Sequence, residues 1–231
     1  MTEASSPAAA GAAIDPAAFW ASLRARHPRL REAVLEDARV TAMHRGERHR
    51  PGSGWRAWTE VARLAWVSDA FLAQALYRAK ARGQALGIPV LPRLAHRLAM
   101  AVAQVSIGDP VLVSPGVYLV HGQVVIDGLV EIGPGVVIAP FVTIGLRAGD
   151  VCGPVVGAGV SIGTGAKLIG PVRIGAGATI GANAVVVDDV APGTTVIGAP
   201  ARPAAPRPAD GEPSASHGAA GFPADYTPPA V

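Results

Sequence analysis

One histidine of this chain stands where its chemistry could be used. His121 is the only histidine between residues 105 and 202. A histidine serves as a general base because its pKa lies near neutral pH, so it can remove the proton of a hydroxyl as that hydroxyl attacks an electrophile. The alternative is a surface histidine that packs on a neighbouring chain. We predict that His121 is catalytic, because it also lies where a repeat is interrupted.

The chain has a single cysteine, Cys152. It can therefore form no intramolecular disulfide, and one chain cannot build a metal site from thiolates alone. A cysteine nucleophile would need a base nearby and an acyl-enzyme intermediate. We favour a passive loop cysteine.

The elements that must position His121 belong to a repeat with a period of six residues. Its thirteen aliphatic positions are Ile107, Val113, Leu119, Ile126, Ile132, Ile138, Ile144, Val156, Ile162, Leu168, Ile174, Ile180 and Val186. Six is not a helical period, and it is too long for one alternating strand. It fits a triangular coil in which each unit supplies a short strand and a corner, with the aliphatic side chain pointing inward. A Gly/Val-rich linker of low complexity would not hold this phase over a dozen units.

Two interruptions break the phase of the repeat. The first adds one residue between Leu119 and Ile126, and it contains His121. The second lies between Ile144 and Val156, where residues 146–154 cannot keep the inward aliphatic pattern. We expect residues 146–154 to leave the prism as a loop, and breaks of this kind are where function tends to lie.

The part of the chain before the repeat predicts helices. Asp15 followed by Pro16 is a typical helix start. Apolar residues at helical spacing predict further helical segments over 55–82 and 91–105. We expect the four tryptophans, Trp20, Trp55, Trp58 and Trp66, to pack in a core or between subunits.

Composition divides the chain into four parts and excludes several classes of protein. We expect a disordered N-terminus over 1–13, a helical domain over 14–104, the repeat domain over 105–202 and a disordered Pro/Ala-rich tail over 203–231. The net charge is +3, and no nucleic-acid motif accompanies the basic residues, so we expect no nucleic-acid partner. The apolar runs are shorter than the ~20 residues of a spanning helix. We therefore expect no membrane span. Because the N-terminus shows no secretory signal pattern, we expect the protein to be cytoplasmic.

Four segments carry a resemblance to a known family. They are Ala75-Leu76-Tyr77-Arg78, His121, Gly163-Thr164-Gly165-Ala166-Lys167-Leu168-Ile169-Gly170 and Gly198-Ala199-Pro200-Ala201-Arg202. On these segments, residues 55–202 resemble the serine acetyltransferases of the hexapeptide-repeat acyltransferases. The resemblance implies an α+β fold, with an N-terminal α-helical domain followed by a left-handed parallel β-helix. It also implies transfer of an acetyl group from acetyl-CoA to the hydroxyl of a small acceptor, L-serine in this family.

The resemblance also implies roles for particular residues. His121 matches the base that deprotonates the acceptor. The expected acetyl-CoA contacts are Gly145, Gly163, Thr164, Lys167, Gly181, Ala182 and Arg202. Arg147 and Asp150, in the second interruption, are expected to contact the acceptor. No metal is expected.

The family is trimeric at the β-helix, with sites between adjacent prisms, and some members pair trimers through the helical domain. We therefore expect a homotrimer, or a dimer of trimers. Some serine acetyltransferases dock a C-terminal tail into cysteine synthase. The corresponding tail here is Thr227-Pro228-Pro229-Ala230-Val231, so the resemblance leaves cysteine synthase as a possible partner.

The sequence departs from the family at two functional points. Val120 stands where the family has an aspartate before the base, and residues 150–154 lack the histidine of the family's loop. Asp127, Glu131 or Asp150, from this or a neighbouring subunit, could orient His121 instead. These departures leave open an acetyltransferase for a sugar or secondary-metabolite hydroxyl, or an inactive scaffold. A zinc carbonic anhydrase on this scaffold needs three histidines at a subunit interface, and each chain offers one.

Overall fold

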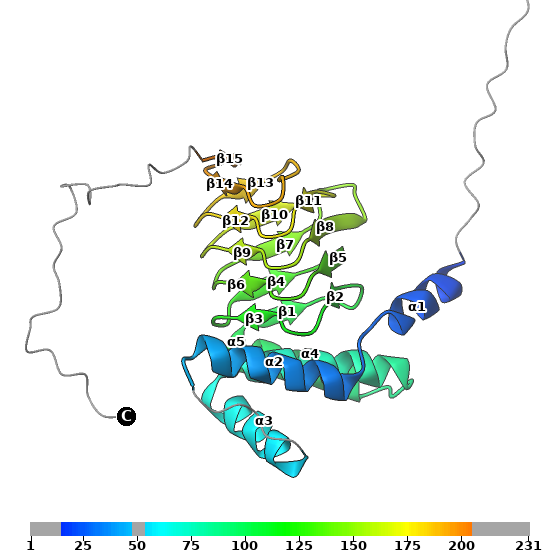
Figure 1. Ribbon diagram of the computed structural model, residues 1–231. Helices are drawn as coiled ribbons and strands as arrows, with labels where there is room; N and C mark the ends of the chain where they lie inside the picture. Colours follow the sequence, from blue (N-terminus) through cyan, green and yellow to red (C-terminus); the bar gives the residue numbers. More distant parts are fainter. Residues whose placement is uncertain (1–14, 48–53, 205–231) are drawn as a thin grey trace, which may run out of the picture.

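The computed structural model describes residues 15–47 and 54–204. Five helices are followed by a coiled stack of short strands, which confirms the predicted helical domain and parallel β-helix (Figure 1). The predicted disordered segments, 1–13 and all but the first two residues of 203–231, lie outside the described residues.

The helices are α1 (Pro16–Ala25), α2 (Leu30–His44), α3 (Trp55–Val67), α4 (Asp69–Ala85) and α5 (Leu91–Ala103). The strands are β1 (Val105–Ile107), β2 (Leu112–Val113), β3 (Tyr118–Leu119), β4 (Val124–Ile126), β5 (Leu129–Ile132), β6 (Val137–Ile138), β7 (Thr143–Gly145), β8 (Cys152–Val156), β9 (Ser161–Ile162), β10 (Lys167–Ile169), β11 (Arg173–Ile174), β12 (Thr179–Ile180), β13 (Val185–Val186), β14 (Thr195–Ile197) and β15 (Arg202–Pro203).

Local signals explain where the helices begin. The Asp15 carboxylate accepts the backbone N–H groups of Ala17 and Ala18 at 3.0 and 3.3 Å, so the predicted start of α1 is confirmed. The single segment predicted over 55–82 is two helices, because Ser68 takes an extended backbone and caps α4 through the Phe71 N–H. A serine hydroxyl satisfies a free helix donor, which makes it a natural break point.

The tryptophans are not core residues of this chain. Trp66 is 89% exposed and Trp55 71%, while Trp20 and Trp58 are 36% and 42% exposed. Trp55, Trp58 and Trp66 all lie on α3. The prediction of core packing was wrong, and packing between subunits stays a prediction.

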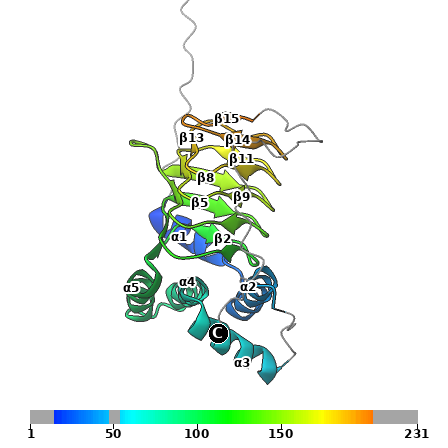
Figure 2. The ribbon, with the colours of Figure 1, turned by 90° about the vertical axis from the view of Figure 1, so that its left-hand side faces the viewer.

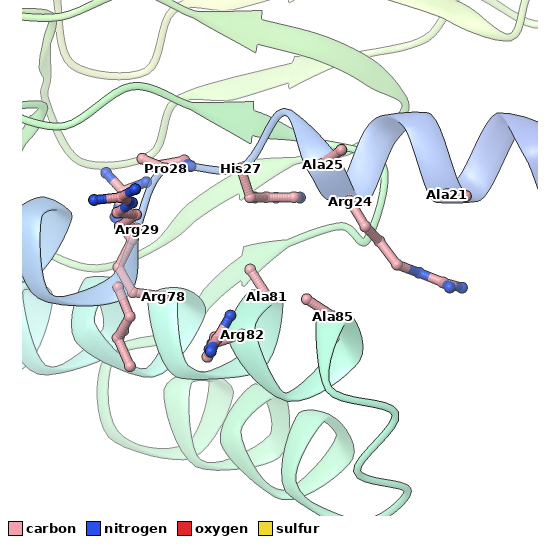
Figure 3. Close-up of a pocket in the computed structure, with 11 residues that line it drawn as sticks. Ala21, Arg24, Ala25, His27, Pro28, Arg29, Arg78, Ala81, Arg82 and Ala85 are labelled. Carbon is pink, nitrogen blue, oxygen red and sulfur yellow. The ribbon is translucent and has the colours of Figure 1, made fainter.

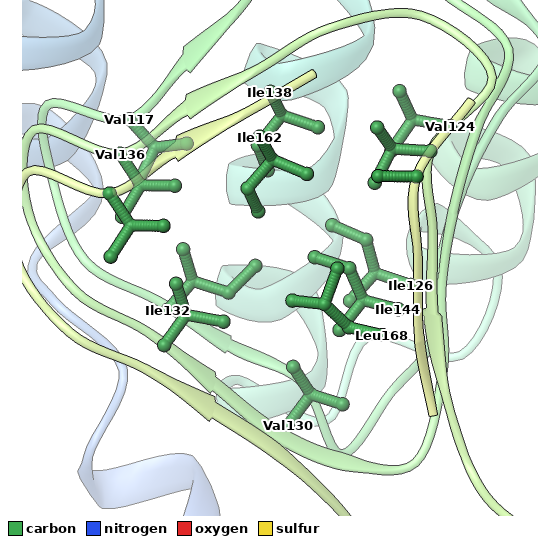
Figure 4. Packing of buried hydrophobic residues seen from close by; sticks show 14 of the residues in the cluster. Val117, Val124, Ile126, Val130, Ile132, Val136, Ile138, Ile144, Ile162 and Leu168 are labelled. Atoms are coloured by element: carbon green, nitrogen blue, oxygen red, sulfur yellow. The ribbon is translucent and has the colours of Figure 1, made fainter. Parts of the chain in front are cut away.

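The repeat forms a three-sided prism. Sheet A has the strand order β1-β4-β7-β10-β13, sheet B has β11-β8-β5-β2, and sheet C has β15-β14-β12-β9-β6-β3. Every pairing except β14 with β15 is parallel. All thirteen predicted aliphatic positions are buried, none more than 4% exposed, and they fill the interior in stacked layers (Figure 4). The period of six therefore described the coil correctly.

Neighbouring coils satisfy each other's backbone. Backbone hydrogen bonds run in both directions between neighbouring coils. The N–H groups of Gly133 and Gly163 donate to the carbonyls of Val156 and Ile180 in the coil above, both at 2.8 Å, and the Asn183 N–H donates to Thr164 in the coil below. The corners are so close that a Cβ on Gly163 would lie 2.7 Å from the Ala182 nitrogen. Glycine is required there because of this close approach of two backbones.

The second interruption is shorter than predicted. Residues 146–151 leave the prism between β7 and β8, but β8 already begins at Cys152. Cys152 to Pro154, predicted to be loop, thus pair with β5 through a register irregularity between Leu129 and Glu131. The aliphatic pattern missed them because Gly153 and Pro154 fill buried positions without a large side chain.

Helix α4 lies under the first coil and closes that end of the prism (Figure 2). The first coil has no coil below it, so those of its carbonyls that face α4 need donors from elsewhere. Side chains of α4 supply them: Gln74 donates to Val117 at 2.9 Å and Tyr77 to Val111 at 2.7 Å. Lys80 donates to the carbonyl of Ile107. The open end of the stack is thereby satisfied by polar side chains rather than by backbone.

Tyr77 and its neighbour Arg78 are both buried at this end of the prism. Burial raises the pKa of Tyr77 to about 12, so its hydroxyl keeps the proton that it donates. Arg78 is 3% exposed and donates to the carbonyls of Val113 and Ser114. Its charge is balanced by Asp37 of α2, at 2.9 Å. This pair links α2, α4 and the first coil.

Removal of the Asp37 charge should destabilise the protein strongly. Asp37 is 1% exposed, and its oxygens accept from Arg78 and from the Gly116 N–H at 2.8 Å. In Asp37→Asn the Arg78 cation stays buried without a counter-charge, so we expect a loss of about 3–5 kcal/mol in the free energy of unfolding. Urea denaturation measures it. The control Asp188→Asn breaks an exposed pair with Arg202 and should cost less than about 1 kcal/mol. Equal losses would contradict the prediction.

Candidate functional site

His121 lies in the turn between β3 and β4, exposed to solvent. This turn is anchored to the end of α5, because the Gln123 N–H donates to the Ala103 carbonyl at 2.8 Å. Gln104 and Gln123 both have positive φ, 53° and 63°, so the backbone turns sharply in both segments where they meet. The extra residue of the first interruption is thus used to meet the helical domain.

A cavity of about 430 Å³ opens beside His121 between the helical domain and the prism. Among the described residues that line it, Asp69 is the one acid and Arg45 the one strong base. Asp69 is the first residue of α4, and Gln104 lines the cavity from the end of α5. These residues were not predicted from the sequence, because nothing in their spacing relates them to His121. The cavity is the size of a small-molecule site.

Four of the predicted acetyl-CoA residues stack above His121 along one edge of the prism. We name this edge corner I: the turns at 120–121, 139–140, 163–164 and 181–182, where sheet C passes into sheet A. The N–H groups of Val120, Ala139, Gly163 and Gly181 each donate to the coil above, at 2.8–3.0 Å. His121, Gly163, Thr164, Gly181 and Ala182 therefore share one ridge. The structure brings the predicted base and this part of the predicted groove together.

Lys167 lies next to corner I, at the start of β10. Its ammonium donates to the carbonyl oxygens of Phe141 and Gly165, at 2.8 and 3.0 Å. Two carbonyls hold the side chain in place, and neither cancels its positive charge. The ammonium of Lys167 is thus held in place near Thr164, where it could contact an anionic group of a ligand.

The remaining predicted residues lie elsewhere in the chain. Gly145 ends β7, and Arg147 and Asp150 follow it in the loop to β8, at the edge where sheet A passes into sheet B; we name this edge corner II. The Arg147 side chain lies over Gly170, where a Cβ would be 3.1 Å from its guanidinium. Sheet A separates corner II from corner I, so one chain does not unite the two sets.

The other predicted partners have local roles within the chain. Arg202, on β15, pairs with Asp188 at 3.2 Å and is exposed. Glu131 pairs with Arg26 of the helical domain at 2.6 Å, and Asp127 follows β4 at corner II. Neither Glu131 nor Asp127 lines the cavity of His121 in the same chain. Asp69 is the acidic residue that lines it. Cys152 is exposed.

Two further findings bear on the site. The described helices include none long and apolar enough to cross a membrane. The described residues also contain no group of three His, Cys, Asp or Glu side chains arranged to hold a metal ion.

Comparison with known proteins agrees with this geometry. Residues 153–188 match the family model for bacterial transferase hexapeptide (six repeats). A serine acetyltransferase from Synechocystis sp. is 37% identical over 151 residues, which are 64% of this chain and 59% of the relative. The chain is similar to serine acetyltransferases. It spans less than two thirds of the length of that curated relative.

Solved structures give the same result for the fold. Soybean serine acetyltransferase complexed with serine is 28% identical with a TM-score of 0.63, covering 79% of this chain and 72% of that one. The serine acetyltransferase of Vibrio cholerae O1 biovar El Tor is 28% identical with a TM-score of 0.62, covering 79% and 68%. The predicted resemblance is confirmed in both sequence and structure.

The turn that carries His121 should be sensitive to a single added methyl group. A Cβ on Gly122 would overlap the Ala103 carbonyl oxygen. We expect Gly122→Ala to lower the free energy of unfolding by about 1–3 kcal/mol, because the turn and α5 must separate. Thermal unfolding measures the change. In the control Gly145→Ala, the nearest atom to the new Cβ is 4.0 Å away, so stability should be unchanged or slightly higher. Unchanged stability of Gly122→Ala would show that the turn is not anchored there.

Proposed function

We propose that this protein is an acetyl-CoA-dependent O-acetyltransferase and that its acceptor is the hydroxyl of L-serine. The observation that carries the proposal is the position of His121 at the base of corner I, below the stacked turns at 163–164 and 181–182. The similarity to serine acetyltransferases, one of them solved with serine, supports the choice of acceptor.

Corner I suits an extended thioester. Three residues of its turns, Gly163, Gly181 and Ala182, have little or no side chain. A pantetheine arm carries amide groups that can exchange hydrogen bonds with such backbone. Lys167, and Arg202 at the far end of the prism, would place positive charge for the phosphates of CoA.

The proposed chemistry is direct transfer. The neutral imidazole of His121 removes the proton of the acceptor hydroxyl as its oxygen attacks the thioester carbonyl carbon. The tetrahedral intermediate collapses, the carbon–sulfur bond breaks, and the CoA sulfur leaves and takes up the proton from the imidazolium. The ester product and free CoA balance the reaction. A backbone N–H near Gly145 is our candidate for stabilising the oxyanion.

A complete site needs more than one chain in this proposal. Gly145, Arg147 and Asp150 lie at corner II, across sheet A from His121. The resemblance implies sites between adjacent prisms, and in a trimer corner II of one subunit could complete the site at corner I of the next. We therefore propose a homotrimer with sites at the subunit boundaries. Pairing of trimers through the helical domain, and docking of the tail into cysteine synthase, stay predictions.

A different acceptor is the second candidate, and specific residues favour it. Val120 replaces the acid before the base, and residues 150–154 have no histidine to hold an amino acid. A sugar or secondary-metabolite hydroxyl would need neither group. In that case Asp69, in the cavity of His121, is the acid available to orient the imidazole.

Acetyl transfer should depend on His121. Purified protein is mixed with acetyl-CoA and L-serine, sugars, amino sugars or other amino acids, and free CoA is followed. We expect His121→Gln to lower kcat by about 10²–10⁴-fold, the usual contribution of a general base, while His96→Gln on α5 has little effect. Release that persists in His121→Gln would reject this base. Failure of the natural chain to release CoA with any acceptor, and to bind acetyl-CoA, would leave the inactive scaffold.

The ridge of corner I should be blocked by one large side chain. Ala182 is exposed, so Ala182→Trp should fold normally yet raise the KM for acetyl-CoA at least about tenfold, the effect of losing one good contact. Ala176→Trp is the matched control, since Ala176 holds the same position of its repeat at another corner and is also exposed. Equal kinetics for the two variants would place the thioester elsewhere.

A further inference from the structure

A second cavity, of about 470 Å³, lies between α4 and the segment that joins α1 to α2. Arg24, His27, Arg29, Arg78 and Arg82 line it (Figure 3). None of its described lining residues is acidic, and the rest are apolar. It shares no lining residue with the cavity of His121. This cavity is therefore a separate, cationic feature of the helical domain.

The positive charge is built into two stretches of sequence. Residues 16–31 contain four arginines and no aspartate or glutamate. The one acid of α4, Asp69, lies at the opposite end of that helix from Arg78, Lys80 and Arg82. Charges of one sign gather where these two stretches face each other, and the low-dielectric walls of a cavity focus such a field.

Two of the arginines are not committed to the fold. Arg78 is held by Asp37 and two backbone carbonyls, and Arg29 lies 3.6 Å from Glu32. Within the described residues, Arg24 and Arg82 have no ion pair and no side-chain hydrogen bond. Both line the same cavity, one from α1 and one from α4. Their guanidinium groups are free to bind a ligand.

His27 also lines this cavity, and its pKa responds to the charges around it. Its ring lies half-buried, 6.3 Å from the Tyr77 ring. Burial, Arg78 and Lys80 lower its pKa. The neutral ring of His27 adds no charge of its own, and no carboxylate of the described residues pairs with Arg24 or Arg82.

We propose that this cavity binds a small multivalent oxyanion, a phosphorylated or tricarboxylate metabolite, between Arg24 and Arg82. A guanidinium offers paired N–H donors that match the oxygens of phosphate and carboxylate. Two free guanidinium groups favour a ligand with at least two negative charges. The volume lies in the range of small-molecule sites, and the ligand would join α1 to α4.

Calorimetric titration of the full chain tests the site. Pyrophosphate and tricarballylate are the two probes, at pH 7.5 and about 0.15 M salt, where surface charge is screened. We expect saturable binding of one or both, and the tighter probe names the source of the oxyanion. Arg24→Gln with Arg82→Gln should weaken it by about tenfold for each guanidinium, the size of one charge-assisted hydrogen bond. The control Arg93→Gln with Arg97→Gln removes the same charge from exposed positions of α5 and should leave binding unchanged.

A second readout locates the ligand. A bound anion favours the protonated form of a nearby imidazole. The NMR titration midpoint of His27, assigned by its loss in His27→Gln, should therefore rise on saturation with the anion. A guanidinium group does not lose its proton where histidine titrates, so the only titration followed here is that of the imidazole. No binding of either probe, equal weakening in the two double variants, or an unmoved His27 midpoint would each overturn the proposal. None of these outcomes depends on acetyl transfer.

Discussion

A stack of parallel coils satisfies its own backbone everywhere except at its ends, and the first coil here is finished by α4. Several of its carbonyls face the helical domain and accept hydrogen bonds from Gln74, Tyr77, Arg78 and Lys80. Without those donors, buried carbonyls would lack partners at a cost of about 1–3 kcal/mol each. The helical domain is therefore the closing surface of the repeat, and the buried Arg78–Asp37 pair is the point at which both parts meet.

The same closure positions the candidate base. Helix α4 packs on α5 more extensively than on any other element, and the end of α5 holds the turn of His121 through Ala103 and Gln123. The imidazole thus stands at the seam between helices and prism, below the ridge of corner I. An imidazole must lie within hydrogen-bond reach of the acceptor hydroxyl to act on it, so a seam between two rigid bodies is a suitable support.

The three-sided prism also limits what one chain can do. Each corner collects residues that are about eighteen positions apart in the sequence, so Gly163 and Gly181 become neighbours. Residues that differ by one side of the triangle, such as His121 and Arg147, are kept apart by a whole sheet. The helical domain distributes its charges in a similar way, with Asp69 at one end of α4 and Arg78 and Arg82 at the other. The two cavities consequently differ in electrostatic character.

The sequence by itself determined the parts of this protein that depend on period and local capping. The six-residue spacing placed all thirteen inward aliphatic side chains, because a buried side chain must recur once per side of the coil, and Asp15 marked the start of α1. It also singled out His121 and the stacked glycines. Only the tertiary structure decided the break at Ser68, the strand that begins at Cys152, the cap formed by α4, and the meeting of Asp69 and Arg45 at the cavity of His121. These depend on contacts between distant segments, whose residue spacing carries no periodic signal.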